Sequence, residues 1–522
     1  MGEDGEVSET RGFPFFWIFV LAFGVYSNIL PAGLIIGLAL WYTLLIYLEN
    51  SGFLKRWNLE RVAGIILMIR TTRGRVFLER ISKNRKFWRM YGEFSIWLCF
   101  LVMFSVVSLM VLAFVTSINS PPQGSLPATD ILFIPGVTSF VPFWWPALAL
   151  IFTLLIHEYS HGIQARAHGM EVRSFGLLVA GPIPVGAFAE PEQMDMVLAP
   201  RRERMRLFAA GPSINLVATF VFLIVIGFLS SGFVATNPGV HALAVIDGGG
   251  ADEAGIKSYD IITHVDGNAV IDYDSFSSQM DSLEAGDEII FTIIPYNDDE
   301  RIWGESSEVP VILGDKAQYY LNLCDDDQEC LDRTTDLLEG YGIGEGEAFL
   351  GVNAPRSGTY QTDRFSFIFE ERYTLGQKAL TLMLTPLSIM GTPMSYDGQT
   401  MDLHERGMIE IDDGFILSSL GTENLLHLFD FIFWLIWVNF LLGFLNLLPI
   451  IPFDGGHMLK DGAHSLLSRI MKGSNPLRVE RIAGSIGGMT TVIMLIIVLI
   501  PCLLYTSPSP RDLSSSRMPS SA

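Results

Sequence analysis

Residues 143–165 read FWWPALALIFTLLIHEYSHGIQA and combine an apolar first half with an ionisable second half. The first half is apolar enough for the interior of a lipid bilayer. On a helix, positions i and i+4 share one face, so His157 and His161 can bind the same metal ion. Glu158 then projects near that ion, where it can act as a base toward water. Because ionisable groups are costly inside a membrane, we expect a metal site rather than a polar helix face.

Long apolar runs dominate the composition of the chain. Half of its 522 residues are hydrophobic, and the mean hydropathy is +0.38. We therefore predict a polytopic α-helical membrane protein of about seven spans in contact with the lipid bilayer. The expected spans are two in residues 13–48 (or one long kinked helix there), 93–116, 143–165, 207–233, 425–451 and 482–500. The sequence has no basic face interleaved with aromatic residues, which argues against nucleic acid as a partner.

Charge is distributed unevenly along the chain, whose net charge is −22. Residues 234–424 hold 36 Asp and Glu but 9 Lys and Arg, so this insert carries about −27 and the remainder about +5. Residues 55–89 contain 11 Lys and Arg, which by the positive-inside rule makes that loop cytoplasmic. We expect an integral protein of the cell membrane, with the histidines toward the cytoplasm and the acidic insert outside.

Two segments outside the spans have patterns typical of β-structure. Residues 174–193 (SFGLLVAGPIPVGAFAEPEQ) predict a strand-like hairpin that could pair with an extended substrate, and we assign Gly186 to substrate binding. Residues 238–313 combine a Gly-rich turn, short alternating strands and a helix, a pattern that resembles a PDZ domain. Cys324 and Cys330 can form a small disulfide loop if the insert faces an oxidising compartment, and they are too few for a zinc site.

A tetrahedral metal site needs one protein ligand more than the two histidines provide. The segment NLLPIIPFDGGH, residues 446–457, follows a predicted span and contains two candidates, Asp454 and His457. The predicted topology brings Asp454 to the cytoplasmic end of its span, at a depth similar to that of His157 and His161. His457 is the rival candidate for the third ligand.

These motifs together resemble the site-2 protease family of intramembrane zinc metalloproteases. The shared elements are HExxH at 157–161, GPxxN at 211–215, NLLP at 446–449 and DGG at 454–456, and the resemblance spans about residues 143–481. One departure is Ser160, which stands where glycine is common in the family. The helix face at that point is therefore expected to be slightly less open.

The resemblance implies a role for each motif residue and zinc as the cofactor. It implies that Glu158 is the general base. It implies that Asn446 is a catalytic residue that holds the substrate or the oxyanion, and that Asn215 contributes to substrate binding. The zinc ligands that it implies are His157, His161 and Asp454.

We divide the chain into six parts: N-terminal spans and basic loop (1–142), first part of the protease core (143–233), PDZ-like domain (234–315), acidic extracytoplasmic segment (316–424), second part of the core (425–501) and C-terminal stretch (502–522). Within the acidic segment, the apolar residues 374–390 are expected to lie along the membrane. The last part contains CLLYTSPSPRD and SRMPSSA, which resemble translated sequencing adapter. We expect an assembly artefact there rather than a genuine Ser/Pro-rich tail.

The expected activity is hydrolysis of peptide bonds in the transmembrane segments of other membrane proteins, which would be the partners of this chain. One alternative is a catalytically inactive membrane scaffold with a PDZ-like domain, which would not need Glu158. Another is a zinc transporter, which would need polar residues along a whole pathway rather than at one depth. The sequence does not define an oligomeric state.

Overall fold

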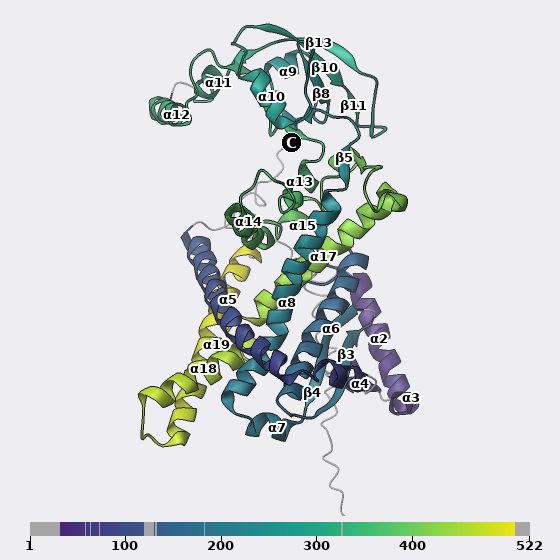
Figure 1. Ribbon diagram of the computed structural model, residues 1–522, viewed down its shortest axis with the longest axis vertical. Helices are drawn as coiled ribbons and strands as arrows, with labels where there is room; N and C mark the ends of the chain where they lie inside the picture. Colours follow the sequence, from purple (N-terminus) through teal and green to yellow (C-terminus); the bar gives the residue numbers. More distant parts are fainter. Residues whose placement is uncertain are drawn as a thin grey trace, which may run out of the picture. The chain divides into compact units, whose positions relative to one another are not determined.

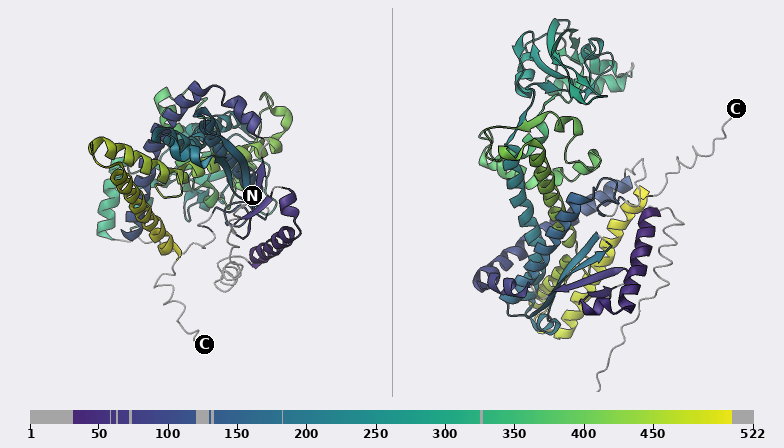
Figure 2. Two further views of the ribbon diagram at one scale, coloured as in Figure 1. Left: turned by 90° about the horizontal axis from the view of Figure 1, so that it is seen from below. Right: turned by 90° about the vertical axis from the view of Figure 1, so that its right-hand side faces the viewer.

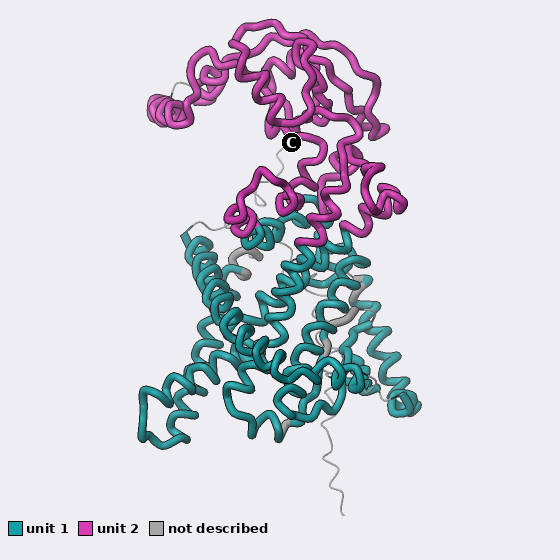
Figure 3. Tube along the Cα trace, viewed as in Figure 1, with its two compact units in different colours: residues 1–223, 382–398, 430–522 teal, residues 224–381, 399–429 magenta. Residues whose placement is uncertain are grey.

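The computed structural model describes residues 32–506 except 58, 63, 72–73, 120–129, 131–132, 182 and 325–326. The chain forms two compact units, which Figure 3 draws in teal and magenta. Unit 1 comprises residues 1–223, 382–398 and 430–522, and unit 2 comprises residues 224–381 and 399–429. Each unit is described by itself below.

Within the described residues, four helices are long and apolar enough to cross a membrane, which supports the predicted helical membrane protein. They are α5 (Arg85–Asn119), α8 (Arg201–Ser230), α17 (Thr422–Asn446) and α19 (Pro476–Thr506). The expected spans in 13–48 lie partly outside the described residues, and the apolar part of α2 (Ala32–Asn50) is shorter than a span. The total of about seven spans therefore stays a prediction. The stretch 502–522 contributes to α19 as far as Thr506, and the rest of it lies outside the described residues.

Helix α6 (Trp144–Ala167) carries the histidine pair and is not among those four helices. It has 24 residues, enough to cross a bilayer, but its second half is polar. Its polar residues also turn inward, since His157, Ser160 and Gln164 are all buried. The helix is therefore shielded by protein on the side that carries the chemistry.

A four-stranded antiparallel sheet lies against α6 in unit 1. Its order is β1 (Leu59–Val62), β2 (Ile66–Thr71), β3 (Val172–Ala180) and β4 (Ile183–Pro191). Strands β3 and β4 confirm the predicted hairpin, which Figure 1 labels beside α6. Strands β1 and β2 come from the basic loop 55–89, and Figure 2 shows them in purple next to the blue β3. Strand β4 is thus at an edge of the sheet.

The remaining short elements of unit 1 connect the spans. They are α3 (Phe53–Arg56), α4 (Arg75–Ile81), α7 (Gln193–Leu198), α15 (Thr392–Ser395) and α18 (Asp454–Ile470). Helix α14 (Leu375–Ser388) has 14 residues, too few to span a bilayer. Its exposed Leu380, Met383, Leu384 and Leu387 follow the i, i+3, i+4, i+7 spacing of one helix face, and its predicted place along the membrane stays a prediction.

Unit 2 contains a small antiparallel sheet of order β13, β10, β8, β6, β17, with β9 paired to β8. Apolar residues alternate along β10 (Glu288–Ile294), so Ile289, Phe291 and Ile293 are buried in its core. The strands continue past residue 315 as far as β17 (Arg356–Ser357), which pairs with β6 (Val240–His241). The other sheet members are β8 (Ile261–Val265), β9 (Asn268–Ala269) and β13 (Ser307–Ile312). The resemblance of this unit to a PDZ domain remains a prediction.

Unit 2 also contains several short helices and strands outside that sheet. The helices are α9 (Gly250–Glu253), α10 (Tyr273–Met280), α11 (Lys316–Asn322), α12 (Gln328–Tyr341), α13 (Tyr360–Ser366), α16 (Leu403–Arg406) and the 3-10 turn η2 (Ser418–Leu420). The short strands are β5 (Phe233–Ala235), β7 (Ala244–Val245), β11 (Tyr296–Asn297), β12 (Ile302–Trp303), β14 (Gly314–Asp315), β15 (Ala348–Phe349), β16 (Val352–Asn353) and β18 (Ile409–Ile411).

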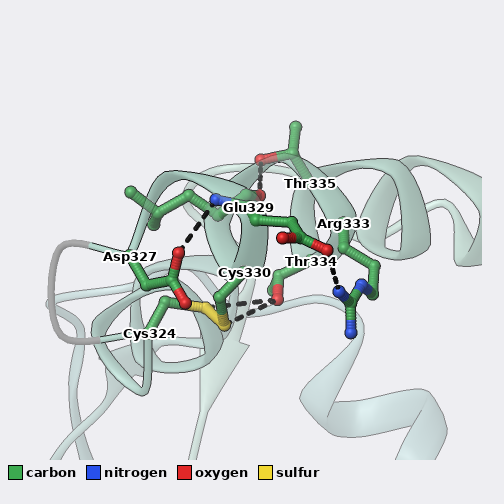
Figure 4. Close-up of a disulfide and its surroundings, with 8 residues drawn as sticks. Cys324, Asp327, Glu329, Cys330, Arg333, Thr334 and Thr335 are labelled. Atoms are coloured by element: carbon green, nitrogen blue, oxygen red, sulfur yellow. Dashed lines mark hydrogen bonds and ion pairs between the residues drawn. A yellow bond between two sulfur atoms is a disulfide. The ribbon is translucent and has the colours of Figure 1, made fainter.

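A disulfide joins Cys324 and Cys330 between α11 and α12, as Figure 4 shows. Asp327 caps α12 by accepting a hydrogen bond from the backbone N–H of Glu329 at 3.0 Å. The disulfide that the sequence allowed is therefore present. Cys99, in contrast, is a buried free thiol in α5.

Candidate metal centre

Three potential metal ligands meet where α6 faces the start of α18. Asp454 Oδ2 lies 3.3 Å from His157 Nε2 and 3.4 Å from His161 Nε2. One donor atom from each residue lies within 4.8 Å of the other two. Two imidazoles and one carboxylate are a donor set that zinc favours, and a fourth position remains for water or substrate.

Helix α8 holds both imidazole rings from behind. His161 Nδ1 lies 2.7 Å from the carbonyl oxygen of Leu207, and His157 Nδ1 lies 2.9 Å from the side-chain nitrogen of Asn215. The Nε2 atoms are thereby turned toward Asp454. Partners of this kind fix the ring orientation of metal-binding histidines.

Gly211 gives the ion its space on the α8 side. A Cβ built on this residue would lie 2.5 Å from His157 Nε2 and closer still to His161 Nε2. The site fits a metal ion because the backbone leaves open the volume that any other residue would fill. The GPxxN motif marked this glycine, but nothing in the sequence assigned it this role.

Asp454 is the first residue of α18, and two glycines set its place. A Cβ on Gly455 would meet the backbone of Leu447 at 2.6 Å, so α18 can begin tightly against the preceding turn only without a side chain there. Burial raises the pKa of Asp454, but His161 and then His157 outweigh it and hold that pKa below its usual range. Asp454 Oδ2 thus faces the same point as the Nε2 atoms of both histidines.

An ion-pair cluster anchors α18 to α8 two turns beyond Asp454. Asp461 is buried and accepts hydrogen bonds from Arg204 Nε at 3.0 Å and from Arg201 Nη1 at 3.1 Å. Removing one partner of such a buried pair typically costs about 3–5 kcal/mol. Asp461 is a structural residue that the sequence reasoning did not identify.

Glu158 lies between the ligand group and the edge strand β4. Its Oε2 accepts a hydrogen bond from the backbone N–H of Ala189 at 2.8 Å. Both residues line a cavity of about 420 Å³ together with the ligand group. The cavity lining is Leu154, His157, Glu158, His161, Gly186, Ala189, Pro191, Met196, Leu207, Phe208, Leu442, Asn446, Pro452, Phe453 and Asp454.

The other residues singled out in the sequence lie at different distances from this cavity. Asn446 and Gly186 line it, and their assigned roles toward a substrate stay predictions. Asn215 is fully buried behind His157, so its assigned role in substrate binding stays a prediction. Ser160 is buried and donates to the carbonyl oxygen of Ala210 at 2.9 Å, which fixes α6 to α8. His457 stacks on Phe208, with ring centroids 4.6 Å apart.

The fold and the site combine apolar helices of membrane-spanning length with a His-His-Asp group and a glutamate at the same cavity, the features of a metallopeptidase family. The family model for Peptidase family M50 matches residues 145–494, and the chain belongs to this family. The predicted membership of the site-2 proteases is thereby confirmed. The family relationship supports zinc as the metal.

Individual relatives are distant in sequence. An uncharacterized protein of Methanocaldococcus jannaschii is 28% identical over 244 residues, which cover 46% of this chain and 62% of that relative. The zinc metalloprotease Rip1 of Mycobacterium bovis is 23% identical over 384 residues, which cover 63% of this chain and 85% of Rip1. The alignment with the first thus leaves more than a third of that relative unmatched.

Replacing Asp454 separates the two candidates for the third ligand. Asp454→Ala is expected to reduce the zinc content of the purified protein from one ion per chain to nearly none, because two histidines alone do not complete the site. His457→Ala should keep its zinc, since the His457 ring packs on Phe208. Elemental analysis of both purified variants measures the zinc content per chain. Full zinc in Asp454→Ala would instead make His457 the ligand.

Proposed function

We propose that this protein is an intramembrane zinc metalloprotease that hydrolyses peptide bonds in the transmembrane segments of other membrane proteins. The observation that carries the proposal is the ligand group His157, His161 and Asp454, with Glu158 at the same cavity, in a unit built from apolar helices. A polar site among apolar helices suits an enzyme whose substrates lie in the bilayer.

The residues of the cavity divide the chemistry of peptide hydrolysis among themselves. Zinc, when bound, polarises the scissile carbonyl and lowers the pKa of a water molecule. Glu158 accepts the proton of the attacking water and delivers it to the departing amine. Asn446 reaches the same cavity with an amide N–H₂ that can donate to the oxygen on which charge develops.

Substrate would be presented as an extended strand. A transmembrane helix hides its amides in internal hydrogen bonds, so it must unwind before it is cut. Strand β4 is an edge strand whose Gly186 and Ala189 line the cavity, and an edge can pair with an extended peptide. Such pairing would bring the scissile bond into the cavity that Glu158 and the ligand group line.

The Glu158→Gln variant tests the proposed function. Glutamine has nearly the same shape as glutamate but cannot accept the proton, so we expect one zinc per chain and cleavage reduced by about 10²–10⁴-fold. Purified variant and unchanged protein would be compared on a membrane-protein substrate in detergent, with elemental analysis alongside. Cleavage that survives this substitution would rule out the assigned base. Zinc without any cleavage in the unchanged protein would favour the inactive scaffold.

We also propose that the acidic insert is outside the cell and the basic loop inside. Besides the charge asymmetry, the disulfide supports this orientation, because disulfides persist in oxidising compartments. A membrane-impermeant thiol reagent applied to intact cells should label Lys257→Cys but not Lys83→Cys, two exposed positions on opposite sides. Broken cells should label both, and the unchanged chain measures the background. Labelling of Lys83→Cys alone in intact cells would reverse the orientation.

A further inference from the structure

The side-chain amide of Asn215 has an unusual environment in α8. The residue is fully buried, and its nitrogen lies 2.9 Å from His157 Nδ1. Its oxygen, Oδ1, has no hydrogen-bond partner among the residues that the structure describes. A buried polar atom without a partner is uncommon and calls for an explanation.

The chemistry of metal binding indicates which end of the Asn215 amide faces His157. His157 Nε2 is the atom that faces Asp454, at 3.3 Å, so its lone pair must be free for a metal ion. A neutral imidazole has one N–H, which must then be on Nδ1. An Nδ1–H is a donor and needs an acceptor, and the amide nitrogen of Asn215 is not one. Rotating the Asn215 amide by 180° puts Oδ1 opposite His157 Nδ1 instead. Both orientations occupy the same space, because the amide oxygen and nitrogen are almost the same size.

His161 shows the same arrangement with an acceptor that cannot turn. Its Nδ1 lies 2.7 Å from the backbone carbonyl oxygen of Leu207, which can only accept. Its N–H is thereby fixed on Nδ1 and its Nε2 is free. Leu207 and Asn215 are eight positions apart on α8, so one helix supplies the acceptors for both rings.

We propose that Asn215 is a positioning residue for the metal centre: its Oδ1 accepts the Nδ1–H of His157 and keeps Nε2 free and aimed at the ion. This inference rests on the proposed function only in requiring that zinc binds. It differs from the role in substrate binding that the GPxxN resemblance implies. Asn215 acts through His157 and has no place in the cavity lining.

The test compares three buried substitutions by their zinc dissociation constants, measured by chelator competition on the full-length protein in detergent. Asn215→Leu keeps the size but removes the acceptor, and the constant should rise about 10–100-fold. Asn215→Asp keeps an acceptor, and the constant should stay within about threefold of the unchanged protein. The thermal midpoint of each metal-free protein shows whether the fold is kept.

Asn439→Leu is the matched control. Asn439 on α17 is also fully buried, has an unpartnered Oδ1 among the described residues, and donates to the Leu435 carbonyl oxygen of its own helix at 2.8 Å. Its substitution should leave zinc affinity unchanged. Equal losses in Asn215→Leu and Asn439→Leu, or a loss in Asn215→Asp as large as in Asn215→Leu, would overturn the proposal. An unchanged protein that binds no zinc would overturn the proposed function itself.

Discussion

Replacing Gly211 with alanine is expected to abolish zinc binding and cleavage while the protein stays folded. The added Cβ would lie 2.5 Å from His157 Nε2, in the space where an ion about 2.0–2.1 Å from that atom must sit. The imidazole rings must turn away from the methyl group and lose their contacts with Leu207 and Asn215. The better helix propensity of alanine, about 1 kcal/mol, offsets part of this loss, so the protein stays folded. We expect the zinc dissociation constant to rise more than about 100-fold, beyond the usual effect of losing an outer partner.

The control for this substitution is Gly488→Ala in α19, where an added Cβ meets no atom within 4 Å. Both variants should have metal-free thermal midpoints close to that of the unchanged protein. Only Gly211→Ala should lose zinc. A Gly211→Ala protein with normal zinc affinity would mean that the ion does not lie between His157 and His161.

The Gly455→Ala variant should lose zinc by a different route, through displacement of the third ligand. Its Cβ would lie 2.6 Å from the carbonyl carbon and oxygen of Leu447 and 2.7 Å from the Leu448 oxygen. Backbone atoms cannot turn aside, so the start of α18 must move and carry Asp454 away from the histidines. Overpacking of this kind typically costs about 1–3 kcal/mol. We therefore expect both a weaker zinc site and a lower thermal midpoint.

Gly484→Ala in α19 is the matched control, since its Cβ would meet nothing within 4 Å. Zinc affinity by chelator competition and the midpoint with and without zinc distinguish the two glycine variants. Gly211→Ala should change the zinc affinity alone, and Gly455→Ala should change both the zinc affinity and the thermal midpoint. An unaltered Gly455→Ala protein would show that α18 can begin elsewhere without loss.

The histidine pair could be predicted because its information is local. Helical periodicity alone places His157 and His161 on one face, and the charge pattern suggested that Asp454 has a similar depth. The exact approach of α6, α8 and α18 could not be predicted, because it depends on contacts between residues far apart in sequence. Gly211 is an example: its spacing relative to the histidines has meaning only after α8 is packed against α6.

The same reason explains why strands β1 and β2 were not foreseen. Residues 55–89 are dominated by lysine and arginine, which suited a cytoplasmic loop and concealed short apolar stretches such as that of β2. Strand β2 gains its partner, β3, only about 100 residues later in the chain. Strands β3 and β4 were foreseen because a hairpin pairs neighbouring residues, whose Gly and Pro signals are visible in the sequence.

The distance along the chain between the ligands also determines when the metal site can form during synthesis. His161 precedes Asp454 by about 290 residues in the sequence. At a synthesis rate of about 5–20 residues per second, the ribosome needs roughly 15–60 s to add that length. Throughout this interval the nascent chain has the glutamate and both histidines but lacks the carboxylate that completes the site. Zinc capture is therefore a late step of biogenesis, and before it the chain lacks the complete site on which the proposed hydrolysis depends.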